Sequence, residues 1–92
     1  LLNVKLPQID TAGSNLIKGQ LVITVSKDGN FGLNGNESHK DEISTVMIEV
    51  AKTSPDVQVL IAADEDSPLK FITEVVDLCR ESGLDNFRLQ SR

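Results

Sequence analysis

Apolar and polar residues alternate in the first third of the chain. Over residues 20–34 apolar side chains recur at every second position, and the sequence KDGN interrupts them at residues 27–30. Gly29 in this tetrapeptide accepts a positive φ at little cost, which is typical of the turn of a β-hairpin. The pattern therefore predicts two antiparallel strands with one apolar face, the first over residues 20–26.

Two later segments have apolar residues at the three- and four-residue spacing of an amphipathic helix. The first is predicted over residues 38–53, where Ser38 followed by Asp41 forms a weak version of a capping box. The second follows Pro68, which suits a first helical turn, and ends at Gly83, a typical C-terminal cap. The inner face of this second helix is predicted to comprise Leu69, Ile72, Val75, Val76 and Cys79.

The remaining apolar segments complete the fold. Residues 57–63 are apolar on both faces, as expected of a strand inside a sheet, and residues 86–90 form a short last strand. The order ββαβαβ predicts an α+β domain over residues 20–92: a small mixed sheet of three or four strands with both helices packed on one face. Right-handed crossovers would make the strand at 57–63 parallel to its neighbours. Residues 1–19 are predicted to be a strand-like segment followed by a flexible linker.

Composition and charge narrow the classes of function. The 92 residues carry a net charge of -5, with three Phe and no Trp or Tyr. An acidic chain with few aromatic residues argues against nucleic-acid binding and against docking on anionic lipid. The single cysteine, Cys79, excludes an internal disulfide and a multi-cysteine metal site.

No catalytic pattern stands out. The acidic residues Asp64, Glu65 and Asp66 lie between a predicted strand and helix, where sites are frequent, but carboxylates also favour helix N-termini and solvent. His39 lies in a polar loop without a partner nucleophile, and Cys79 falls on an apolar face. We predict no enzyme, cofactor or metal site. A small metal-binding domain or enzyme using the acidic residues, and a ferredoxin-like regulatory domain, are the alternatives from other classes.

Four sequence stretches in this order and spacing resemble the periplasmic domain of the ExbD/TolR family. They are NVKLP near the start, LVITVSKDGNFGLNG, VQVLIAAD, and ITEVVDLCRESGLDNFRLQSR at the end, and together they span nearly the whole chain. The family consists of subunits of proton-driven motors in Gram-negative inner membranes. The resemblance implies a transmembrane helix before residue 1, so this chain, which begins without methionine, is expected to be the periplasmic part of a single-pass inner-membrane protein.

The resemblance also implies partners. An ExbD-like protein would bind and energise TonB for outer-membrane transport, whereas a TolR-like protein would bind TolA and peptidoglycan and maintain envelope integrity. The stretch SKDGNFGLNG favours the ExbD-like alternative. Either protein would assemble as a homodimer with an ExbB- or TolQ-like membrane subunit. The resemblance further implies a membrane-proximal segment that helps to close the proton path at rest, matched here by Leu2, Val4, Leu6 and Pro7.

A small open sheet leaves strand edges that can add a strand from a partner protein. Two strands are the candidate edges: the first strand of the hairpin and the last strand of the chain. Their residues are Leu21, Val22, Ile23, Thr24 and Val25, and Asn86, Phe87, Arg88, Leu89 and Gln90.

Overall fold

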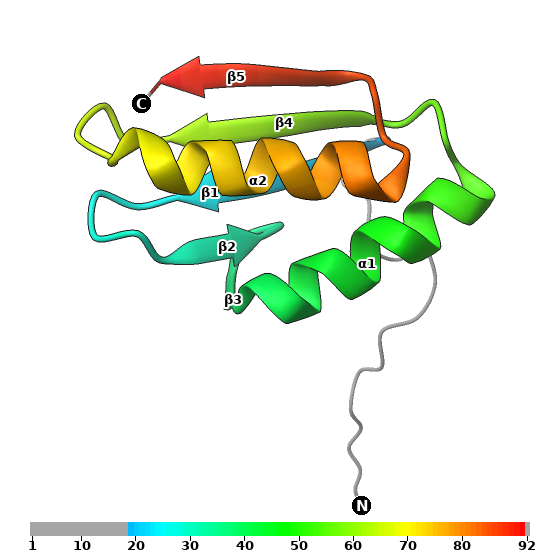
Figure 1. Ribbon diagram of the computed structural model, residues 1–92, viewed down its shortest axis with the longest axis horizontal. Coiled ribbons are helices and arrows are strands. Elements are labelled where there is room, and N and C mark those ends of the chain that lie inside the picture. The colour runs from blue at the N-terminus through cyan, green and yellow to red at the C-terminus, as the bar shows by residue number, and fades with distance from the viewer. Residues whose placement is uncertain (1–18, 92) are drawn as a thin grey trace, which may run out of the picture.

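One sheet and two helices make up the computed structural model, which describes residues 19–91 (Figure 1). The sheet is mixed, and the strand order across it is β3-β2-β1-β4-β5. The elements along the chain are β1 (Gln20–Val25), β2 (Phe31–Leu33), β3 (Asn36–Ser38), α1 (Lys40–Thr53), β4 (Gln58–Ala63), α2 (Leu69–Ser82) and β5 (Phe87–Ser91).

The pairing of the strands confirms the predicted α+β fold. β2 is antiparallel to β1 and β3, whereas β4 is parallel to both β1 and β5, as right-handed crossovers require. The sheet has five strands rather than three or four, because β3 folds back onto β2. Asn34 and Gly35 form the turn between them, with φ angles of 50° and 94°. An Asn-Gly pair with positive φ at both positions is the favoured turn of a tight hairpin.

Both helices cover the same face of the sheet (Figure 1). The chain moves in one direction across the sheet, from β1 to β4 to β5, so two right-handed crossovers place α1 and α2 on one side. Lys40 Nζ of α1 lies 3.6 Å from Glu74 Oε1 of α2. The fully buried side chains between the helices and the sheet include Leu21, Ile23, Val59, Ile61, Ile43, Met47, Val50, Val75 and Cys79.

The N-terminal cap of helix α1 lies one residue later than the sequence predicted. Ser38 was expected to cap it, but Ser38 ends β3, where it pairs with Phe31. His39 is the N-cap instead, and its backbone N–H donates a 2.8 Å hydrogen bond to the side chain of Glu42. The acceptor therefore lies three residues after the cap, which is the spacing of a capping box.

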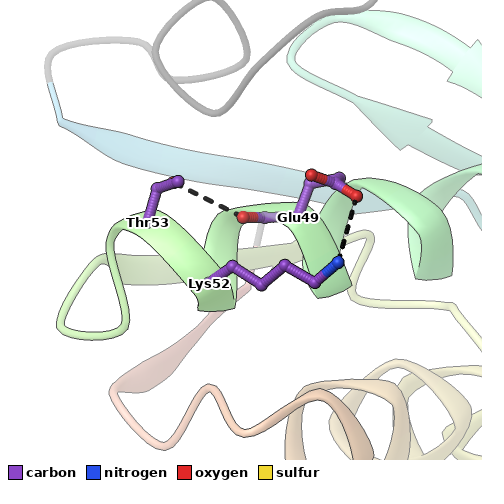
Figure 2. Close-up of polar contacts among 3 residues, drawn as sticks. All are labelled: Glu49, Lys52 and Thr53. Carbon is purple, nitrogen blue, oxygen red and sulfur yellow. Dashed lines mark hydrogen bonds and ion pairs between the residues drawn. The ribbon is translucent and has the colours of Figure 1, made fainter.

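The last turn of α1 carries local polar contacts on its solvent side (Figure 2). Lys52 Nζ lies 3.6 Å from Glu49 Oε2, and the hydroxyl of Thr53 donates a 3.4 Å hydrogen bond to the carbonyl of Glu49. Exposed ion pairs at this spacing contribute about 0.3 kcal/mol. These contacts support the end of the helix but do not decide the fold.

Helix α2 buries a narrower stripe than predicted. Gly83, with φ 90°, caps its C-terminus as expected. Leu69 was predicted on the inner face but is 73% exposed. The buried residues of α2 are Val75 and Cys79, and Phe71, Ile72 and Val76 are half-buried against the core. Within residues 19–91 no helix has the length and apolarity needed to cross a bilayer.

Candidate functional site: the outer edge of strand β5

Strand β5 forms one edge of the sheet. Among the described strands it pairs with β4 alone, whereas β1 pairs with β2 on one side and with β4 on the other. The prediction that residues 21–25 form an edge was therefore wrong. β2 pairs with one side of β1, and the crossover through α1 places β4 on the other side. The backbone of β1 is therefore hydrogen-bonded on both sides. Residues 86–90 do lie at an edge, and partner binding there stays a prediction.

The hydrogen bonds of β4 determine which groups of β5 point outward. The amide of Val59 donates a 2.9 Å hydrogen bond to the carbonyl of Asn86, and Val59 stands opposite Phe87 in the register. In a parallel pair a residue bonds to the two neighbours of its opposite residue, so the backbone groups of Asn86, Arg88 and Gln90 face β4. Backbone direction alternates along a strand, so the N–H and C=O groups of Phe87 and Leu89 face outward.

The side chains of these same two residues lie on the helix side of the sheet. Phe87 is opposite the buried Val59, and Leu89 is opposite the buried Ile61. Leu89 is 59% exposed, although it is a large apolar residue. The outward backbone groups of β5 therefore lie next to apolar side chains that are incompletely covered.

Beside Leu89 there is a shallow groove of about 180 Å³ between α2 and the ends of β4 and β5. Ala63, Ile72 and Leu89 provide its apolar surface. The half-buried Val76 lies one turn after Ile72 on α2 and continues the apolar strip along the helix. The polar rim consists of Asp64, Glu65, Ser67, Gln90 and Ser91.

Sequence reasoning missed this groove. Ile72 was assigned to the inner face of its helix from the three- and four-residue spacing of apolar residues. That spacing does not indicate that Ile72 lines a groove beside the last strand. Because α2 runs back across the sheet, Ile72 of α2 and Leu89 of β5 line the same groove. The position of β5 at the edge of the sheet leaves this groove open to solvent.

The other edge of the sheet has a different character. β3 has three residues, and Asn36 and Glu37 are exposed. A broad, open hollow of about 540 Å³ lies over the ends of β1, β2 and β3, and its lining includes Thr24, Asn36 and Glu37. A short polar strand offers no apolar anchor for a partner, so β5 is the better candidate of the two edges.

The acidic residues after β4 form a turn. A carboxylate oxygen of Asp64 accepts a 2.8 Å hydrogen bond from the backbone N–H of Asp66. The hydroxyl of Ser67 donates to the carbonyls of Val25 and Ser26, at 3.1 and 3.0 Å, and ties this turn to the end of β1. Within the part of the chain that the structure describes, no group of three or more His, Cys, Asp and Glu side chains is arranged to hold a metal ion.

The remaining candidate residues have structural positions. His39 caps α1, and Cys79 is fully buried on α2. Burial raises the pKa of the Cys79 thiol to about 11, so the thiol stays protonated and unreactive near neutral pH. The four predicted residues of the membrane-proximal segment lie outside the described residues: Leu2, Val4, Leu6 and Pro7.

Comparison with known families gives a match over the full sequence. The family model described as "Biopolymer transport protein ExbD/TolR" matches residues 1–92, the whole length of the chain. A search of curated proteins gives no match to this chain. Proteins of the matching family are subunits of inner-membrane motors that have a periplasmic domain and work with membrane subunits such as ExbB or TolQ. The chain belongs to the ExbD/TolR family of biopolymer transport proteins.

Proposed function

We propose that this domain is the periplasmic partner-binding part of an ExbD-like motor subunit, and that it binds and energises TonB for outer-membrane transport. The observation that supports it is the outer edge of β5. There the outward backbone groups of Phe87 and Leu89 lie beside an apolar groove, within the residues that the structure describes. An extended segment of a partner gains main-chain hydrogen bonds at such an edge and an apolar pocket for its alternate side chains.

Strand addition is also a suitable way to transmit force. A strand that joins β5 is linked through the parallel pairs β5–β4 and β4–β1 to the centre of the domain. A pull along the added strand then acts in shear on several main-chain hydrogen bonds at once. The family places the anchor of the motor in the inner membrane with an ExbB/TolQ-type subunit, so the domain is proposed to relay force from that anchor to TonB.

Two further parts of the proposal concern assembly. The segment containing Leu2, Val4, Leu6 and Pro7 alternates apolar and polar residues and ends at a proline. We propose that it helps to close the proton path at rest. The domain is proposed to act as a homodimer, which is the commonest symmetric arrangement of soluble chains.

A TolR-like function, with TolA and peptidoglycan as partners, is the second candidate. The hollow over β1, β2 and β3 favours it, because Thr24, Asn30 and Asn36 supply the hydroxyl and amide groups that bind sugars and peptides. Under this alternative the polar hollow, and not β5, is the surface that binds the cell wall.

A titration followed by NMR tests the proposal. The ¹⁵N-labelled domain is mixed with overlapping peptides from the periplasmic linker of the TonB of the same organism. We expect one peptide to shift the amide signals of Phe87 and Leu89 most. Shifts confined to the hollow, or no shifts together with sedimentation of the domain with purified cell wall, would favour the TolR-like function instead.

A further inference from the structure

The edge of β5 carries charges as well as apolar side chains. Arg88 is exposed and projects from the sheet face that the helices leave open, since it stands beside Leu60 rather than on the side of Phe87 and Leu89. Among the described residues it makes no ion pair. At the end of the strand, on the helix side, Asp64 and Glu65 line the groove together with Ser91.

These features assign an environment to each position of an added strand. In an antiparallel pair, residues that stand opposite each other project their side chains to the same face. A residue opposite Leu89 would therefore enter the groove beside Ile72, and the residue opposite Phe87 would lie two positions further on the same apolar strip. The residue between them would stand opposite Arg88 on the open face.

Of these opposing pairs, the pair at Arg88 would have the shortest distance between its two Cα atoms. The outward backbone groups of Phe87 and Leu89 make these the hydrogen-bonded positions, so Arg88 falls at a non-hydrogen-bonded position, where opposing Cα atoms are about 4.5 Å apart. A carboxylate at that position of the partner reaches the guanidinium of Arg88. A basic residue opposite Ser91 lies instead near the carboxylates of Asp64 and Glu65.

We infer that the β5 edge selects an antiparallel partner strand whose sequence reads, from its N-terminus, basic, any residue, apolar, acidic, apolar. This inference rests on the proposed function and names the chemistry of the segment that binds. The protein's own segment at residues 2–6 has the apolar alternation but offers Asn3 or Lys5, and no carboxylate, to Arg88. The charges therefore favour a segment of another protein over that segment.

Two synthetic peptides of identical composition test the inference. Acetyl-Thr-Lys-Thr-Ile-Glu-Val-Thr-amide carries the inferred order, and acetyl-Thr-Glu-Thr-Ile-Lys-Val-Thr-amide exchanges the two charges. Binding to the ¹⁵N-labelled domain is measured from amide shifts at low salt. We expect the first peptide to bind about fivefold more tightly, because both charged pairs become like-charge pairs in the second. The Arg88→Glu variant removes one favourable pair and should abolish or reverse this preference, and its NMR spectrum reports whether it is folded.

Equal affinity of the two peptides would overturn the inference, as would an unchanged preference in Arg88→Glu. A third result would also overturn it: neither peptide binds, and the NMR signals of β5 shift with the concentration of the domain. A second copy of the chain would then occupy the edge. The proposed function fails separately. If a TonB linker peptide shifts Phe87 and Leu89 but the two synthetic peptides bind alike, strand addition stands and only the charge order is wrong.

Discussion

The hydrogen bond from the amide of Val59 to the carbonyl of Asn86, 2.9 Å long, sets the alternation of the backbone along β5. Because of this bond, the backbone N–H and C=O groups of Arg88 and Gln90 point toward β4. The backbone N–H and C=O groups of Phe87 and Leu89 point away from the sheet. The apolar side chains of β5 thus belong to the residues whose backbone groups are unused within the described part of the chain. A partner strand would meet both at once.

This alternation predicts opposite effects of proline at neighbouring positions. Proline is tolerated on an edge strand where the missing N–H would have faced solvent. We expect Leu89→Pro to fold and to weaken partner binding by about tenfold or more, because an outward donor is lost. Gln90→Pro removes a donor to β4 and should lower the free energy of unfolding by about 2 kcal/mol relative to Leu89→Pro. Chemical denaturation and peptide titration measure the two effects.

Leu89→Ala is the control for the side chain. It keeps the outward N–H but removes most of the apolar contact in the groove, so its binding should fall between those of the native protein and Leu89→Pro. If Leu89→Pro binds the partner as well as Leu89→Ala does, the outward amide takes no part in recognition.

Gly29 in the β1–β2 turn is predicted to resist substitution. Its φ is 86°, and a Cβ atom there would lie 2.5 Å from the ring of Phe71, which packs edge-on against Phe31. Gly29→Ala should lose about 2 kcal/mol of stability from the strained φ and the displaced ring. Gly35→Ala is the matched control, because φ there is 94° but no atom lies within 4 Å, so it should lose about 1 kcal/mol. Thermal unfolding of the two variants distinguishes them, and equal losses would mean that the ring contact costs nothing.

The hydroxyl of Ser67 should contribute to the stability of the whole domain. It donates hydrogen bonds to the carbonyls of Val25 and Ser26, more than 40 residues away in the sequence. We expect Ser67→Ala to lower the free energy of unfolding by about 1 kcal/mol. Ser38→Ala removes only a local, exposed bond to the carbonyl of Asn36 and should change stability by less than about 0.5 kcal/mol. A Ser67→Ala variant as stable as Ser38→Ala would contradict this role.

Stability should fall at alkaline pH because of Cys79. Burial raises the pKa of its thiol to about 11, above its ordinary value of 9.0, so the native state keeps a proton that the unfolded chain releases. The contribution of the Cys79 thiol to the free energy of unfolding is fully present below the pKa that the thiol has in the unfolded chain. It is lost as the pH rises through the pKa that the thiol has in the folded protein. Denaturation from about pH 9 to about pH 11, the interval between the two pKa values, should show a smaller loss of stability for Cys79→Ala than for the native protein. Equal losses would mean that the thiol is not shielded.

The sequence predicted the elements that bury an apolar face better than those that do not. β4 and the core residues of both helices follow from periodicity, because burial requires it. The polar strand β3 was missed, since the residues of Asn36–Ser38 do not alternate and their pairing depends on the turn at Asn34 and Gly35. The Asn-Gly dipeptide was a signal for that turn.

The wrong edge has a different cause, since β1 pairs with β2 and β4 and does not pair with β3. With β3 and β2 on one side and β4 on the other, β1 lies inside the sheet, and strand order is a property of the whole chain that no local pattern reports. Strand β5 was predicted both as a strand and as a candidate edge, and it does lie at an edge of the sheet. The groove beside it could not be predicted, because Ile72 and Leu89 line it together only through the way that α2 lies over the sheet.

Hydrogen exchange along β5 tests the central claim most directly. In the free domain the amides of Arg88 and Gln90 should exchange slowly and those of Phe87 and Leu89 rapidly, because only the first two face β4. A saturating TonB linker peptide should then protect Phe87 and Leu89 and leave the other two unchanged. Binding of that peptide without new protection at Phe87 and Leu89 would contradict strand addition at this edge.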